Sequence, residues 1–280
     1  MRCSSRIVRV TLTSKTTPMK NLFCFQNAKT TKGLQHGYHT AVLYLAPAKI
    51  AGDGINTCEH ATHQCKVLCL NTAGKGIFKN IQQSRIKKTR WMNNHPAEFW
   101  ERVDKEVLNH ENNTHRMQTR LKRKFRPCVR INGTSDLWNT DIRTIMYRHP
   151  DVQFYDYTKD YLRVLDWMLG KMPRNYHLTY SFGGDADSLA KAKYLLGQGV
   201  NVAVVFDAKP KESLPTTWNH FYVVDGDKHD LRFLDKGKVQ YGVGCDEPTS
   251  EGLVIGLRAK GKARGVIAVQ NSFINPNIDS

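Results

Sequence analysis

The middle of the chain, roughly residues 128–206, alternates short apolar runs with helical patterns, and this alternation constrains the fold most. The apolar runs are rich in β-branched residues and bounded by turn formers, which is typical of buried strands. Strands that alternate with helices form βαβ units and a parallel sheet. We therefore expect an α/β fold, with an incomplete or irregular TIM-like barrel as the favoured architecture and a flavodoxin-like open sheet as the alternative.

The expected strands are 39–45, 128–131, 152–157, 176–180, 200–206, 221–224, 231–234, 253–258 and 266–270. Apolar residues spaced by three or four predict helices over 76–91, 97–110, 160–169 and 186–196. The C-terminal third is rich in strands, and turns at 225–227 and 235–237 predict hairpins there. We expect residues 19–280 to form a single α/β catalytic domain, and residues 1–18 to be a basic tail or a mis-called start.

The charge of the chain predicts a polyanionic partner. Lys and Arg number 42 against 25 Asp and Glu, which gives a net charge of +17 and a pI of about 9.6. Such a charge is typical of proteins that bind nucleic acid. Anionic lipid is the alternative, but the sequence carries no amphipathic anchor, no lipidation motif and no apolar stretch of the length a membrane span requires. We therefore expect no membrane partner.

Two basic stretches predict where nucleic acid binds, because cations can hold phosphates and interleaved aromatic rings can stack on bases. Trp91, Trp100 and Phe125 are interleaved with them. The alternative for these aromatic residues is a place in the core. The predicted DNA-binding residues are Lys75, Arg85, Lys87, Lys88 and Arg90 in the first stretch, and Arg120, Lys122, Arg123 and Lys124 in the second.

A cluster of cysteine and histidine residues follows the first expected strand. Cys58, His60, His63, Cys65 and Cys69 fall within twelve residues. The seven cysteines of the chain follow no secretory signal, so a reducing, cytosolic compartment is expected, where clustered thiols serve as metal ligands or reactive groups. The three cysteines with one histidine, His60 or His63, have the ligand types of a structural zinc site, and the cysteines alone those of an iron–sulfur cluster. The alternative is three buried thiols with exposed histidines.

Polar residues follow several expected strands, and in a barrel they would open on one rim. Asp136 and Asp156 each lie just beyond or at the end of a strand and are the candidates for a catalytic carboxylate. As an alternative, both aspartates cap the helices that follow. The predicted substrate-binding residues beside them are Arg130, Asn132, Ser135 and Lys159.

Several long segments of the chain resemble a tailed-phage family called gene product 88. The resemblance covers roughly residues 38–264 and rests on LAPAKIAG, CEHATHQCKVLCLNTAGKG, RINGTSD, VQFYDYTK, NYHLTYS, NVAVVF, DGDKHDLRFLD and GLRAKGKA. It implies a phage protein that acts in the host cytoplasm. The family name itself implies no chemistry.

Phages modify their DNA to evade host restriction, so the resemblance and the basic charge together lead to a DNA-modifying enzyme acting on double-stranded DNA. We expect a transglycosylase that exchanges guanine for a small 7-deazaguanine base, by analogy with the barrel enzymes that act on guanine in tRNA. One alternative is an iron–sulfur radical enzyme that uses S-adenosylmethionine and modifies a nucleobase. The other is a non-enzymatic phage protein that binds nucleic acid.

Overall fold

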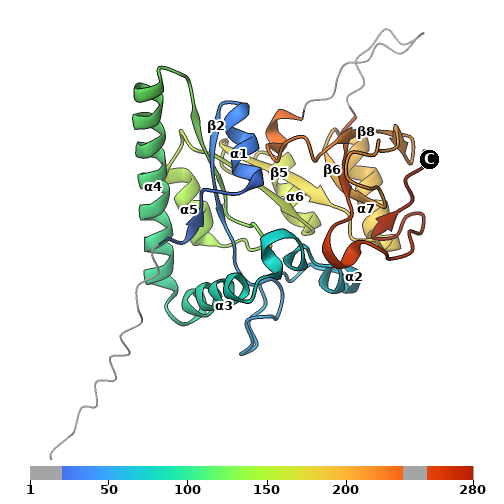
Figure 1. The fold of residues 1–280 in the computed structure, drawn as a ribbon, viewed down its shortest axis with the longest axis horizontal. Helices are drawn as coiled ribbons and strands as arrows, with labels where there is room; N and C mark the ends of the chain where they lie inside the picture. The colour runs from blue at the N-terminus through green and yellow to red at the C-terminus, as the bar shows by residue number, and fades with distance from the viewer. Residues whose placement is uncertain (1–20, 236–250, 280) are drawn as a thin grey trace, which may run out of the picture.

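The computed structural model describes residues 21–235 and 251–279 of the chain (Figure 1). The prediction for residues 1–18, and that for the turn at 235–237 beyond Asp235, therefore lie outside the described residues. The strands of the described part are β1 Phe23–Cys24, β2 Tyr38–Leu43, β3 Arg126–Arg130, β4 Gln153–Thr158, β5 Tyr176–Ser181, β6 Val202–Phe206, β7 Thr217–Trp218, β8 Phe221–Asp225, β9 Val254–Arg258 and β10 Ile274–Asn275. The α-helices are α1 Ala28–Gln35, α2 His63–Val67, α3 Lys79–Asn94, α4 Pro96–Leu121, α5 Thr140–Arg148, α6 Tyr161–Met168 and α7 Ala186–Gly197.

These strands form one largely parallel sheet in the order β1-β2-β3-β4-β5-β6-β9-β8-β7, with β10 paired to β6. Strands β2 to β6 lie side by side in chain order, as consecutive strands of a barrel do. Within the described ranges, however, the path of paired strands ends at β1 and β7, so the sheet is open and the expected TIM-like barrel is not closed. A flavodoxin-like sheet would instead reverse its strand order beside the first strand.

Four helices cover one face of the sheet. Residues of α4, α5, α6 and α7 share a single hydrophobic core with the sheet, and Val129, Phe154 and Leu178 are among its central members. Parallel strands that follow one another in chain order, joined by right-handed crossovers, place their connecting helices on the same face. The alternation of strands and helices between 128 and 206 is therefore confirmed.

Helix α4 is the longest helix of the described residues and stands along one side of the sheet (Figure 1). Pro96 begins it, where a missing backbone N–H costs nothing. Phe99, Val103 and Val107 recur on one face and are buried in the core. The helix ends before Lys122, whose φ of 48° is the left-handed conformation of a helix C-cap. The structure extends the helix predicted over 97–110 by eleven residues to Leu121.

The opposite face of the sheet is covered by α1 and by the segment 226–235. Lys29 of α1 forms an ion pair with Asp230 at 3.1 Å. Leu231 packs against Cys128 of β3 and Tyr155 of β4. This segment contains a 3₁₀ helix, η3 Arg232–Leu234, where the sequence predicted a strand. The strand predicted over 231–234 is therefore wrong. The 3₁₀ turn packs Leu231 and Leu234 against the sheet, as a strand would have done.

The C-terminal third departs from its prediction in two further ways. Residues 266–270, expected as a strand, form turns and irregular structure. The hairpin predicted around the turn at 225–227 is wrong, because the residues after that turn form η3 and not a strand. A hairpin forms instead between β7 and β8, and both residues of its two-residue turn, Asn219 and His220, have positive φ, as a type I′ turn requires. Strand β8, however, pairs in parallel with β9, which lies between it and β6.

Candidate functional site

Polar side chains from the ends of β3, β4 and β5 meet at the carboxyl ends of the strands. Asn132, just after β3, lies against Asp156 of β4. Asp136 accepts a hydrogen bond at 2.9 Å from the backbone N–H of Lys159, which follows β4. The Lys159 ammonium in turn reaches Ser181 at the end of β5. The structure therefore brings together the polar groups that the sequence predicted at neighbouring strand ends.

Asp156 is fully buried and holds the loop that follows β3. Its carboxylate accepts hydrogen bonds from the backbone N–H and the side-chain amide of Asn132, at 2.8 and 3.0 Å. The Asn132 side chain also donates to the carbonyl of Leu137 and accepts from the Ser135 hydroxyl. Burial raises the pKa of Asp156 to about 6, against the opposing effect of nearby arginines. In this structure Asp156 therefore positions a loop and is closed to a substrate.

Asp136 is more accessible than Asp156. Its side chain keeps 11% of its surface exposed and forms an ion pair with Arg163 at 3.2 Å. The backbone N–H of Lys159 donates to its second oxygen. Of the two predicted catalytic aspartates, Asp136 is the one a ligand can approach.

Lys159 lies at the centre of this carboxyl-end group. Its Nζ donates to the carbonyl and hydroxyl of Ser181 and to the carbonyl of Phe182, at 2.9 to 3.0 Å. Burial lowers the pKa of the Lys159 ammonium below its usual value, and the nearby Cys65 and Asp136 side chains oppose that shift. The ammonium is thus turned toward the end of β5 rather than toward the surface.

Arg130, predicted to reach a phosphate, is buried on the opposite face of the sheet. Its guanidinium donates to Asp230 at 2.9 Å and lies over the ring of Tyr157. Asp230 also accepts hydrogen bonds from Lys29 and from the Tyr155 hydroxyl. Burial alone would raise the pKa of Asp230, but the Lys29 and Arg130 cations outweigh it and hold that pKa well below its usual range. Arg130 therefore anchors the segment 226–235 and is closed to phosphate in this structure.

The cysteine segment packs over the carboxyl ends of the strands. The Cys58 thiol accepts a hydrogen bond from the backbone N–H of Ala48 and donates to the carbonyl of Thr134. Burial raises the pKa of this thiol to about 11, which favours the protonated form. Thr62 donates to the carbonyl of Gly183, which joins this segment to the end of β5.

The remaining predicted metal ligands lie closer to the surface. Cys65 and Cys69 are partly exposed, and His60 pairs with Asp160 at 3.4 Å. In the part of the chain that the structure describes, no three or more His, Cys, Asp or Glu side chains are grouped so as to hold a metal ion. A site built from Cys58, Cys65, Cys69 and His60 would need these side chains to rearrange. Zinc or iron–sulfur binding therefore stays a prediction.

The first basic stretch divides between surface and interior. Lys75, Lys87 and Arg90 are exposed, and α3 packs on the segment that follows β2, at the carboxyl end of the sheet (Figure 1). Arg90 also donates to the carbonyl of Ala51 and pairs with Asp53 at 3.4 Å. Lys75 and Lys87 are the cations of this stretch that stay available to a phosphate.

Two cations of the same stretch are buried. Arg85 donates to the Asn71 side chain, and its guanidinium lies 5.0 Å from the ring centre of Tyr44. Lys88 donates to the carbonyl of Leu22. These contacts hold both side chains inside the fold, where they do not reach a phosphate. The prediction that Arg85 and Lys88 bind DNA is therefore wrong for this structure.

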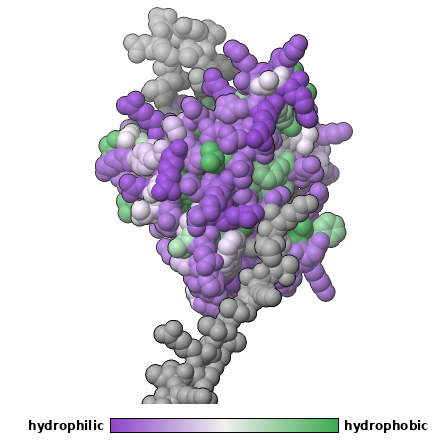
Figure 2. All heavy atoms as spheres, turned by 90° about the vertical axis from the view of Figure 1, so that its left-hand side faces the viewer, coloured by the Kyte–Doolittle hydropathy of each residue, from purple (hydrophilic) through white to green (hydrophobic). Residues whose placement is uncertain are grey.

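The cations of the second basic stretch are all exposed. It occupies the last turns of α4 and the connection to β3, on the hydrophilic face that Figure 2 shows. We call this set the amino-end basic surface, because it directly precedes β3. Its members are Arg116, Arg120, Lys122, Arg123, Lys124 and Arg126. Strand β3 separates it from the carboxyl-end group by five residues, or about 16 Å at roughly 3.3 Å per residue.

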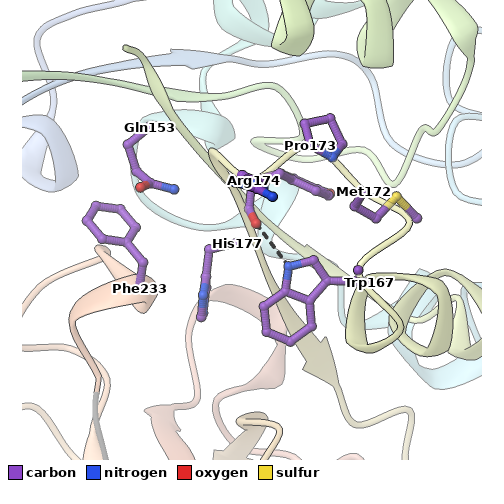
Figure 3. Close-up of a pocket in the computed structure, with 9 residues that line it drawn as sticks. Gln153, Trp167, Met172, Pro173, Arg174, His177 and Phe233 are labelled. Atoms are coloured by element: carbon purple, nitrogen blue, oxygen red, sulfur yellow. Dashed lines mark hydrogen bonds between the residues drawn. The ribbon is translucent and has the colours of Figure 1, made fainter. Parts of the chain in front are cut away.

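A cavity that the sequence did not predict lies at the amino ends of β4 and β5 (Figure 3). Its volume is about 520 Å³. The rings of Trp167, His177 and Phe233 line it, together with Gln153 and Arg174. These residues come from four separate segments of the chain, so no local motif marks them. An aromatic residue or a lone histidine in an expected strand is, by sequence, indistinguishable from a core residue.

The fold and these sites define a mixed α/β protein with an open, largely parallel sheet and polar groups gathered at both ends of its strands. The family model for gene product 88 matches residues 21–268, so the chain belongs to the gene product 88 family. Neither the comparison with curated proteins nor that with solved structures gave a match. Within 21–235 and 251–279, none of the helices combines the length and the apolar character that crossing a membrane requires.

Proposed function

We propose that this phage protein binds DNA through the amino-end basic surface. The observation that carries the proposal is that all six cations of this surface are exposed within eleven residues. By contrast, Arg130, Arg163 and Arg232 are buried in ion pairs. Exposed cations held close together neutralise neighbouring phosphates and release counterions, which gives affinity for DNA of any sequence.

The salt dependence of binding tests this proposal. The DNA affinity of the parent protein should fall with a log–log slope of about −0.9 for each phosphate neutralised. A variant with four cations replaced should show a shallower slope and weaker binding at 50 mM salt, as measured by fluorescence anisotropy with a labelled duplex. The replaced residues are Arg120, Lys122, Arg123 and Lys124, each changed to Ala.

A matched variant controls for the loss of net charge. It also loses four exposed cations, but from α7 and from the segments after β6 and β8, toward the other end of the strand order: Lys193, Lys209, Lys211 and Lys228, each changed to Ala. This control should keep the slope of the parent protein. Equal losses in the two variants would mean that only net charge matters and would reject a defined DNA surface.

For the reaction, we propose exchange of guanine in phage DNA for a 7-deazaguanine base, with Asp136 as the nucleophile. This proposal is supported by the position of Asp136 at the carboxyl ends of parallel strands, where ligands of α/β proteins bind, and by its partial exposure. The Arg163 guanidinium and the Lys159 backbone N–H donate to its two oxygens and fix its orientation. The exposed Lys75 and Lys87 of the neighbouring stretch supply cations at this end of the sheet.

Incorporation of labelled 7-cyano-7-deazaguanine into duplex DNA measures this activity. Asp136→Asn keeps the shape of the side chain and one acceptor, but removes the nucleophile, so incorporation should fall by at least about 10³-fold. Asp185→Asn is the matched control, because Asp185 caps α7 and Asn caps about as well as Asp. Parent-like incorporation by Asp136→Asn excludes it as the nucleophile. No incorporation by the parent protein rejects base exchange and leaves DNA binding to stand alone.

A further inference from the structure

The cavity at the amino ends of β4 and β5 has the walls of a site for a flat heteroaromatic ring. The Trp167 and His177 ring centres lie 5.3 Å apart at 79°, and those of His177 and Phe233 lie 6.4 Å apart at 73° (Figure 3). The indole N–H of Trp167 donates to the carbonyl of Tyr176 at 2.9 Å, which fixes that ring. Rings at these distances and angles pack edge to face on one another, so a planar group would stack on the outer face of a ring that borders the cavity.

Two polar atoms in the cavity wall have no partner among the described residues. His177 Nε2 is buried without a hydrogen bond. Both hydrogen bonds of the Gln153 side chain are donated by Nε2, to the carbonyls of Phe154 and Asn175, which leaves its Oε1 as a free acceptor. Buried polar atoms are nearly always paired in folded proteins, so the unpaired His177 nitrogen is the wall atom that a ligand in this cavity would pair with.

The charge state of His177 suits a neutral hydrogen-bonding edge. Burial and the nearby Arg232 lower the pKa of His177 to about 4, so the imidazole is neutral at pH 7. A neutral imidazole donates from one nitrogen and accepts at the other. The cavity wall therefore presents two hydrogen-bonding groups: the Gln153 side-chain oxygen, which accepts, and the His177 imidazole, which donates or accepts. The edge of a nucleobase carries donors and acceptors that can pair with both.

Cations stand where the phosphates of such a nucleotide would lie. Arg174 lines the cavity and is exposed. Arg126, the last member of the amino-end basic surface, begins β3 on the same face and at the same end of the sheet as Gln153 and His177. The register pairs Cys128 with Gln153, and neighbouring strands lie about 4.8 Å apart. The basic surface and the cavity are therefore adjacent.

We infer that this cavity binds the base of an unpaired nucleotide whose phosphates lie on Arg174 and the amino-end basic surface. The inference rests on the proposed DNA binding and adds to it a preference for single strands or flipped bases. A base inside a duplex cannot enter a cavity without leaving its stack. Because Gln153 Oε1 accepts hydrogen bonds, the cavity favours bases with an exocyclic amino group, so cytosine binds better than thymine. A free nucleotide shares this chemistry.

Fluorescence anisotropy tests the inference. The labelled ligands are a deoxycytidine decamer, a deoxythymidine decamer and a duplex, and unlabelled dCMP is the competitor. The parent protein should prefer the deoxycytidine decamer over the deoxythymidine decamer. His177→Phe and Gln153→Leu should each weaken binding of the deoxycytidine decamer by about tenfold, the equivalent of one hydrogen bond. Their salt slopes should equal that of the parent, because every cation is retained.

Two controls separate binding from folding. His177→Phe removes a nitrogen that bonds to nothing in the described chain, so its melting temperature should equal or exceed that of the parent. Gln198→Leu, an exposed position after α7, should bind like the parent. Parent-like affinity of both His177→Phe and Gln153→Leu for the deoxycytidine decamer overturns the inference.

The remaining outcomes separate the base site from the proposed function. A parent protein that binds duplex with a steep salt slope, yet shows no preference for single strands or for cytosine, overturns the base site and leaves DNA binding in place. Competition by dCMP at the affinity of the decamer, lost in His177→Phe, supports the base site with a free nucleotide as its ligand, and counts against the proposed DNA surface.

Discussion

Two buried aspartates show how the environment of a residue decides its role. Asp156 and Asp230 are both cut off from solvent, yet only Asp230 has cations in direct contact with its carboxylate. Asp156 accepts two hydrogen bonds from the neutral Asn132 instead. Its pKa is therefore raised by burial, whereas the pKa of Asp230 is lowered by its partners. Neither difference is visible in the sequence, where both are aspartates next to strands or turns.

Asp156 should make the stability of the protein depend on pH. Its pKa is about 6 in the folded protein and near 3.9 in an unfolded chain, so between these values the folded state binds more protons than the unfolded state. The free energy of unfolding should then fall as the pH rises from about 4 to about 6, by an amount on the order of 2 kcal/mol. Asp156→Asn removes this group, so urea unfolding of the variant should show a smaller fall than the parent over that range. Parallel curves for the two proteins would contradict the shifted pKa.

At the residue scale, the sequence predicted contacts between neighbouring strand ends but not which long side chains turn inward. Asn132, Asp136 and Lys159 follow successive parallel strands, and topology alone brings such positions together. Arg85 and Lys88 lie on the inner face of α3 beside Thr89, so the buried face of that helix is polar. A polar inner face has no hydrophobic pattern that would distinguish it from a solvated one.

Helix α4 links three parts of the molecule. Its apolar face enters the core, its last turns carry part of the amino-end basic surface, and Glu106 on its first half holds the edge strand. Glu98 lies in its first turn and Arg120 in its last turn. This order opposes the helix dipole at both ends and stabilises the helix apart from any role in binding.

Replacing Glu106 should loosen the first strand. Its buried carboxylate accepts hydrogen bonds from the backbone N–H groups of Leu22 and Phe23. Glu106→Ala leaves both donors buried and unpaired, so the free energy of unfolding should fall by about 1–3 kcal/mol. Hydrogen exchange at the Leu22 and Phe23 amides should also accelerate. Glu101→Ala, which removes only an exposed pair with Lys105 on the same helix, should change stability by less than about 0.5 kcal/mol.

Helices and strands were predictable from the sequence where the pattern of apolar and polar residues was long and uninterrupted. The strands from 128 to 206 alternate with helices and are found where the sequence placed them. Helix α5 was missed, although Asn139 caps its first turn by accepting a hydrogen bond from Ile142 N–H. It is only nine residues long and follows a polar loop, so its apolar residues form no sustained period. The apolar run 231–234 could pack its leucines against the sheet either as a strand or as a 3₁₀ turn, so its composition did not distinguish the two.

At the scale of the whole molecule, the parallel α/β class was predictable and the closure of the sheet was not. Each βαβ unit specifies that the next strand lies beside the last, but closure also depends on the tilt and stagger summed over all strands. Here the segment 226–235 packs on the face that a barrel would enclose, and its Asp230 and Arg232 are buried there in ion pairs. That segment fills the space into which further strands would have curved.

The order of strands also bears on how the chain acquires its structure as it leaves the ribosome. Strands β2 to β6 each join a neighbour that has already been synthesised, so the sheet can grow by local additions with little loop-closure cost. Strand β9 is the exception, because it inserts between β6 and the earlier β8. The β7–β8 hairpin therefore waits with an unpaired edge until residues 254–258 emerge. During translation, that edge and the facing edge of β6 are both open to pairing with another chain.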